Sequence, residues 1–140
     1  MRFSIILRRF EEMFLRMKFA QEKTEHYTIL RVLSEKLDNS VSPDLKSEFL
    51  LLNKDGVCNI ILDLTETRYC DSSGLSSVLV ANRLCKNDNG TLVLVGLQPS
   101  VRKLITISQL ESVLQIVPTV SEAIDFLFME SIEKDLNKND

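Results

Sequence analysis

The sequence has few of the residues on which most enzyme active sites depend. Its 140 residues include no tryptophan, one histidine, three prolines, three cysteines and four glycines. A serine or cysteine hydrolase would have to use that histidine, His26, as its base, and a histidine-based metal site would have a single imidazole. Four glycines leave little material for a glycine-rich phosphate loop. These absences weaken the commonest hydrolase, metal and nucleotide-binding sites, but they do not exclude enzymes in general.

The cysteines, the charge and the hydropathy limit the compartment and the partners. Cys58, Cys70 and Cys85 are odd in number and widely spaced, which favours reduced thiols in the cytoplasm over a disulfide framework or a zinc site. A formal net charge of −3 offers no electrostatic footprint for nucleic acid. No apolar run approaches the roughly 20 residues that span a bilayer, so we expect no stable membrane insertion.

Residues 1–16 differ from the rest of the chain. Their pattern predicts an amphipathic helical extension, with arginines and glutamates between apolar residues at helical spacing. Such a helix could contact a membrane surface or a partner. It could also dock on its own domain, or be an extension that the natural protein lacks, since Met17 could itself be a start. The apolar positions are Phe3, Ile6, Leu7, Phe10, Met13 and Phe14.

The remaining pattern predicts one α/β domain over residues 17–132, followed by a polar tail at 133–140. Residues 58–64 and 91–97 are continuous apolar runs, typical of strands covered on both faces. Residues 18–37 predict one or two β-prone strands that could form a hairpin edge, and 113–117 predict a last short strand. Helices are expected from Ser42 as N-cap with Pro43 in the first turn, over 74–87, over 99–110 and after 118. The expected fold is a mixed, mostly parallel central sheet flanked by about four helices, with the N-terminal helical extension.

The sequence Asp71-Ser72-Ser73-Gly74 joins a predicted buried strand to a predicted helix. A nucleophile elbow would need a glycine before the serine, a base and an orienting acid, and a P-loop would need further glycines and a lysine. Neither pattern is complete here. From the residues alone, the favoured interpretation is a helix cap, with Asp71 or Ser72 accepting hydrogen bonds from free amides and Gly74 allowing close approach.

The same stretch in its context resembles the signature of STAS domains, the family of bacterial anti-sigma factor antagonists and sulfate-transporter tails. The segment "DLTETRYCDSSGLSSVL" has the Asp-Leu strand end, the aromatic residue and the Asp-Ser-Ser-Gly-Leu helix start of that family, in order and spacing. The segment "SEKLD", residues 34–38, stands where the family has Gly-Glu-Leu-Asp. The resemblance extends over roughly residues 18–130 and implies a STAS-like single domain.

The resemblance also implies a function and its residues. In antagonists of this kind, an anti-sigma factor serine/threonine kinase phosphorylates the second serine of Asp-Ser-Ser-Gly, which is Ser73 here. The unmodified protein would sequester that kinase and so release a sigma factor, and a PP2C-type serine phosphatase would restore binding after phosphorylation. The implied partner-binding residues are Asp38, Asp71, Ser72, Ser73, Gly74 and Ser76, whereas Ser77 is expected to be an ordinary surface residue. A binding module of this kind is expected to have no catalytic residues, no metal and no cofactor.

The sequence departs from the family pattern at two positions, and two alternative functions remain open. Glu35 replaces the family's glycine, and Lys36 replaces its glutamate, which reverses a charge beside the expected interface. The departures put the identity of the partner in doubt more than the fold. The first alternative function is a STAS scaffold, never phosphorylated, or an accessory subunit of a membrane lipid or anion transport system. The second alternative is a small hydrolase or nucleotide-binding enzyme, which His26 and the scarcity of glycine make remote.

Overall fold

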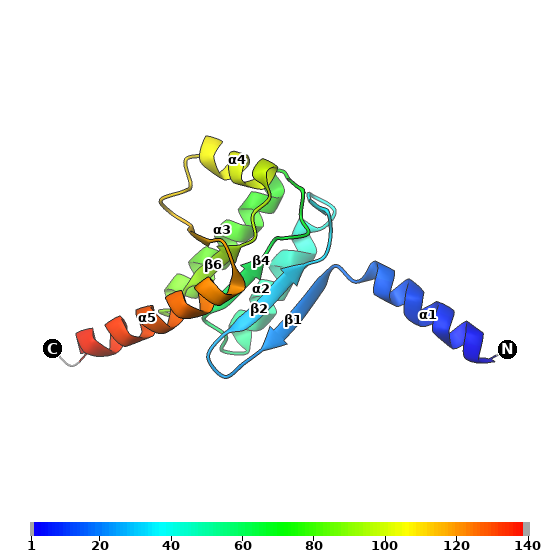
Figure 1. The fold of residues 1–140 in the computed structure, drawn as a ribbon, viewed down its shortest axis with the longest axis horizontal. Coiled ribbons are helices and arrows are strands. Elements are labelled where there is room, and N and C mark those ends of the chain that lie inside the picture. Colours follow the sequence, from blue (N-terminus) through cyan, green and yellow to red (C-terminus); the bar gives the residue numbers. More distant parts are fainter. Residues whose placement is uncertain (1, 139–140) are drawn as a thin grey trace.

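The computed structural model describes residues 2–138 as a helix that precedes a layered α/β domain (Figure 1). The helices are α1 (Arg2–Arg16), α2 (Ser42–Lys54), α3 (Ser72–Asn87), α4 (Pro99–Ile107) and α5 (Val120–Lys138). The strands are β1 (Phe19–Lys23), β2 (Thr28–Val32), β3 (Lys36–Leu37), β4 (Ile60–Asp63), β5 (Tyr69–Cys70), β6 (Leu92–Val95) and β7 (Gln115–Val117).

The main sheet has five strands in the order β1-β2-β4-β6-β7. β1 is antiparallel to β2 and forms the edge hairpin, whereas the other neighbouring pairs are parallel. Ile61 of β4 lies between Ile29 of β2 and Val93 of β6, so the register brings apolar residues of three strands together. The expected mixed, mostly parallel sheet is therefore confirmed.

Alternation along the strands divides the core into two layers. Ile60 and Leu62 of β4 belong to the larger cluster, which also contains buried residues of α2, α3 and α4. Ile61 faces the other way and packs with Ala123 and Leu127 of α5. Because both faces of β4 are covered, its sequence is apolar at successive positions rather than at every second one.

The start of α2 corrects one prediction. Ser42 is the first helical residue rather than the N-cap, and the capping position is Val41, which provides no side-chain hydrogen bond. The Ser42 hydroxyl instead donates to the carbonyl oxygen of Asp38 at 2.6 Å. The prediction was wrong because a turn from Asp38 to Ser42 satisfies the first amides, with Val41 N and Ser42 N both donating to the Asp38 carbonyl.

Two further features concern the ends of the chain. α5 continues beyond Ile132 to Lys138, so residues 133–138 of the expected polar tail are helical. The last two residues of that tail, 139–140, lie outside the described residues. Figure 1 shows α1 projecting away from the layers of the domain. Over residues 2–138, no helix is both long enough and apolar enough to cross a membrane.

The core position of Phe49 generates a stability prediction. Phe49 is 1% exposed, whereas Leu50, the next residue of α2, is 54% exposed. Phe49→Ala should lower the free energy of unfolding by about 3–5 kcal/mol, because it removes a buried ring and leaves a cavity. Leu50→Ala, the matched control, should change it by less than about 0.5 kcal/mol. Urea unfolding followed by circular dichroism measures both, and equal effects of the two substitutions would contradict the layer assignment.

Candidate functional site

The candidate site lies where two loops meet at the carboxyl end of the parallel strands. β3 pairs with β5 in parallel, with Leu37 opposite Cys70, and the backbone N–H of Asp71 donates to the Leu37 carbonyl at 3.2 Å. A Cβ on Gly74 would overlap that same carbonyl oxygen and would lie 2.8 Å from Cys70 Sγ. Position 74 therefore accepts only glycine, and the loop after β3 sits directly against the first turn of α3.

Asp71 caps α3, as one of the two predicted caps. Its backbone is extended, and its Oδ1 accepts hydrogen bonds from the Gly74 amide at 3.0 Å and from the Ser73 hydroxyl at 2.6 Å. These hydrogen bonds lower the pKa of Asp71 below its usual value. The bond from the Ser73 hydroxyl has the largest effect, and the bond from the Gly74 amide has the next largest. Asp71 is thus held as a carboxylate, where it complements the positive end of the helix dipole.

The Ser73 hydroxyl is half-buried and has a defined orientation. Its oxygen lies 2.6 Å from Asp71 Oδ1 and 3.1 Å from the hydroxyl oxygen of Ser42. Ser42 in turn lies 2.6 Å from the Asp38 carbonyl oxygen. Each hydroxyl has one proton to donate. The carbonyl oxygen of Asp38 and the carboxylate oxygen of Asp71 can only accept, so the Ser42 proton points to Asp38 and the Ser73 proton points to Asp71. Ser73 therefore donates to Asp71, and a lone pair of its oxygen faces the Ser42 hydroxyl.

Ser77 is buried, which contradicts its prediction as an ordinary surface residue. Its hydroxyl lies 3.1 Å from the Ser73 carbonyl oxygen and 3.3 Å from the Ser42 carbonyl oxygen, and it can donate to either. The prediction was wrong because α2 packs across this face of α3. Ser42 and Ser77 are the polar residues of the site that sequence reasoning missed. The sequence did contain one signal for Ser77. It lies four residues after Ser73, a spacing at which a serine hydroxyl in a helix can donate to the earlier residue's carbonyl oxygen.

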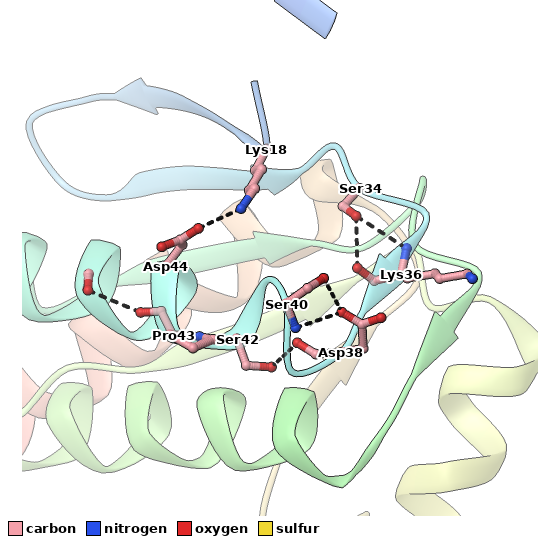
Figure 2. Close-up of polar contacts among 9 residues, drawn as sticks. Lys18, Ser34, Lys36, Asp38, Ser40, Ser42, Pro43 and Asp44 are labelled. Atoms are coloured by element: carbon pink, nitrogen blue, oxygen red, sulfur yellow. Dashed lines mark hydrogen bonds and ion pairs between the residues drawn. The ribbon is translucent and has the colours of Figure 1, made fainter. Parts of the chain in front are cut away.

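Asp38 forms the turn that carries α2 to the site (Figure 2). Its Oδ1 accepts from the Ser40 amide at 3.0 Å and from the Ser40 hydroxyl at 2.6 Å. The Ser40 hydroxyl is the largest cause that lowers the pKa of Asp38, the charge of Lys36 lowers it further, and the charge of Asp71 opposes both. Asp38 and Asp71 are therefore close enough for their carboxylates to interact electrostatically.

The other expected site residues lie on the solvent side of the same region. Ser72 and Ser76 are exposed on the first turns of α3, and Tyr69 of β5 is 51% exposed. Lys36 is exposed beside Asp38, and Glu35 forms a long ion pair of 4.0 Å with Arg68. The structure thus gathers Asp38, Asp71, Ser73 and Gly74 at one point, with Ser72 and Ser76 on the adjoining surface.

The site does not contain the groups of a serine hydrolase. His26 lies in the turn before β2, at the amino end of that strand, and its ring packs edge-on against Phe128 with centroids 5.9 Å apart. Ser73 follows the opposite, carboxyl end of the parallel strands, so His26 cannot act as its base. Burial raises the pKa of Cys70 to about 12, and the nearby Asp71 adds to the effect, so the neighbouring thiol is protonated and inert at neutral pH.

Comparisons with known proteins identify the family and the fold. The model of the STAS domain family matches residues 18–123. The fold is similar to that of the Bacillus cell fate determinant SpoIIAA in its phosphorylated form, with 27% sequence identity and a TM-score of 0.61, over 76% of this chain and 96% of that one. The unphosphorylated form of SpoIIAA, an anti-sigma factor antagonist, gives 26% identity and a TM-score of 0.62, over 76% and 94% of the two chains.

Two more distant structures share the fold. An anti-sigma factor antagonist from Mycobacterium paratuberculosis has 19% identity and a TM-score of 0.70, over 78% of this chain and 92% of that one. The murine anion transporter Slc26a9 has 16% identity and a TM-score of 0.64, over 77% of this chain but 18% of the transporter. The structural neighbours thus include several anti-sigma factor antagonists, which supports that general class.

The Asp71 cap generates a prediction with a defined pH dependence. Asp71→Ala should lower the free energy of unfolding at pH 7 by about 1 kcal/mol, because the Gly74 amide loses its acceptor. Asp71→Asn keeps an acceptor and should lower it less. Because the pKa of Asp71 is lowered in the folded state, the carboxylate's contribution is complete above the ordinary aspartate pKa of about 3.9 and is lost as the pH falls through the lower folded value.

Urea unfolding of the wild type and Asp71→Asn, measured from pH 7 down to about pH 2.5, tests this dependence. The stability difference between the two proteins should shrink on the acid side. A difference that stays constant over this range would show that the Asp71 charge does not contribute.

Proposed function

Because this chain belongs to the STAS domain family, we propose that it is an anti-sigma factor antagonist whose binding is switched by phosphorylation of Ser73. In the unmodified form it sequesters an anti-sigma factor serine/threonine kinase, and a sigma factor is released. Phosphorylation of Ser73 by that kinase ends the association, and a PP2C-type phosphatase restores it. On this proposal the chain is a binding module and a kinase substrate rather than an enzyme.

The observation that carries the proposal is the setting of the Ser73 hydroxyl. It is half-buried at the amino end of α3, oriented by its 2.6 Å hydrogen bond to Asp71 and unaccompanied by a histidine base. This setting supports a serine that receives a phosphoryl group over one that attacks a substrate. The similarity to SpoIIAA, whose structure exists in phosphorylated and unphosphorylated forms, supports the proposal that this chain is also phosphorylated.

Electrostatics explains how a phosphate can change binding while the fold survives. The phosphate adds about −1.5 to −2 charges beside the Asp71 carboxylate. Two unit charges 4 Å apart repel by roughly 4 kcal/mol at an effective dielectric constant of 20, so the phosphate and the Asp71 carboxylate repel each other. Both are also acceptors for the Gly74 amide, which already donates to Asp71. The phosphate can itself accept from the free amides of α3, which limits the loss of fold stability.

The partner meets a different surface after modification. The added charge stands beside Asp71 and within the electrostatic reach of Asp38, on a surface that also presents Ser72 and Ser76. A partner surface packed against the neutral hydroxyl would have to desolvate a dianion that lacks a paired cation. Lys36, where the family has glutamate, lies next to Asp38 and is expected to select a kinase with a complementary acidic group.

Incubation with the cognate kinase and ATP tests the modification. Mass spectrometry should place one phosphate on Ser73, and Ser73→Ala should abolish it. Ser72→Ala and Ser76→Ala, which change exposed neighbouring hydroxyls, should retain phosphorylation. Phosphate on another residue would contradict the assignment of Ser73. The absence of phosphate with every candidate kinase would favour the unphosphorylated scaffold.

Binding of the kinase tests the switch itself. Ser73→Ala should keep affinity, and Ser73→Asp should weaken it by about tenfold or more, because it introduces a charge that the interface must desolvate. Isothermal titration calorimetry measures both, and thermal unfolding checks that both proteins are folded. Loss of binding by Ser73→Ala as well would show that the hydroxyl acts as a contact rather than as a switch.

A further inference from the structure

Helix α1 presents an apolar face that its own domain does not cover. Phe3, Ile6, Leu7 and Phe10 are between 49% and 74% exposed. At 100° per residue these four positions, with 13 and 14 by sequence spacing, fall within an arc of about 120°. An arc of this width belongs to a helix whose face is buried in its working state.

The charges of α1 differ from those of the domain. The helix has four arginines and two glutamates, a net charge of +2, whereas the whole chain has a net charge of −3. The remaining residues therefore carry −5. By sequence spacing, Arg2, Arg8, Arg9 and Arg16 all fall outside the apolar arc. The face opposite the arc carries the arginines together with one exposed apolar residue, Ile5. A face rich in phenylalanine opposite a face rich in arginine is the pattern of helices that lie in a membrane interface.

We propose that α1 is a docking helix for an anionic lipid surface, with its apolar face in the headgroup region and its arginines at the phosphates. The charge difference within the chain supports this occupant, because an anionic bilayer attracts α1 and repels the acidic domain. Figure 1 shows the geometry that this requires, with α1 projecting away from the domain. The helix lies on the bilayer and does not cross it.

Pairing with α1 of a second copy fits the charges of α1 less well than a lipid surface does. Pairing of α1 with α1 in a dimer would place a net positive charge on both sides of the contact. A lipid surface presents the opposite charge instead. Each arginine near an anionic surface contributes about 1 kcal/mol, so a net charge of +2 corresponds to a preference of at least about tenfold for anionic over neutral vesicles.

Vesicle co-sedimentation of the full chain tests the proposal. Vesicles of phosphatidylcholine with phosphatidylglycerol should bind the protein at least about tenfold more strongly than phosphatidylcholine alone, and added salt should weaken the binding. Phe10→Glu should reduce binding by about tenfold or more, because it places a charge in the apolar arc. Arg8→Gln with Arg9→Gln should remove most of the preference for the anionic vesicles.

Ile132→Glu is the matched control, since Ile132 is 55% exposed on α5 and Phe10 is 59% exposed on α1. It makes the same charge change on a different exposed helix and should leave vesicle binding unchanged. Thermal unfolding of Phe10→Glu should match the wild type, because Phe10 is not part of the core. Three outcomes would overturn the proposal: no binding to either vesicle, binding that survives Phe10→Glu, or a dimer by light scattering that Phe10→Glu dissociates.

Discussion

The close approach of Gly74 to the Leu37 carbonyl is the constraint on which the site depends. Any side chain at position 74 would overlap that oxygen, so the glycine lets the loop after β3 pack on the first turn of α3. The hydrogen bond from Asp71 N to Leu37 O and the short β3–β5 pairing hold the two loops in that position. The turn at Asp38 is then carried to the amino end of α3, and the Ser42 hydroxyl reaches Ser73. One missing Cβ thus brings together residues more than thirty positions apart.

This packing gives the site an unusual balance of charge. Two carboxylates, Asp38 and Asp71, lie close enough to interact, yet hydrogen bonds from serine hydroxyls and from amides lower the pKa of both. Neutral donors are the main stabilising groups of both carboxylates, with a smaller contribution from the charge of Lys36 at Asp38. Phosphorylation of Ser73 would remove the hydroxyl proton that Asp71 accepts, and the remaining neutral donors cannot neutralise the added charge. A phosphate at the proposed site, Ser73, would therefore be recognised by a partner as uncompensated charge.

Much of the fold could be predicted from the sequence, because its signals are local. The continuous apolar runs around Ile61 and Val93 indicated strands covered on both faces, and the structure places both strands inside the sheet. The Asp71 cap could be predicted for the same reason, since the helix that it caps begins at the next residue. Family resemblance then supplied the proposed role of Ser73, which no pattern of apolar and polar residues could have provided.

The missed parts of the site depend on contacts between distant segments. Ser42 resembles an N-cap in sequence, but its hydroxyl donates to the carbonyl oxygen of Asp38. The Ser73 hydroxyl, on a different helix, lies next to that of Ser42. Ser77 resembles a surface residue until α2 covers it. In both cases, local chemistry gave the residue a reasonable role, and tertiary packing gave it another. Polar residues between two helices are poorly predicted for this reason, because neither segment alone shows that its neighbour will be buried.

The place where α1 joins the domain connects the two proposed surfaces. Lys18, just after α1, forms an ion pair of 2.7 Å with Asp44 in the first turn of α2, two residues after Ser42 (Figure 2). The Lys18 carbonyl also accepts from Leu33 N, at the end of β2 that leads to β3 and Asp38. The chain therefore leaves α1 at the same end of the sheet as Ser73. A domain attached to a lipid surface through α1 would hold the proposed phosphorylation site, Ser73, at the end of the sheet that faces this attachment. Repulsion between an anionic bilayer and a phosphate would act only within about 8–10 Å.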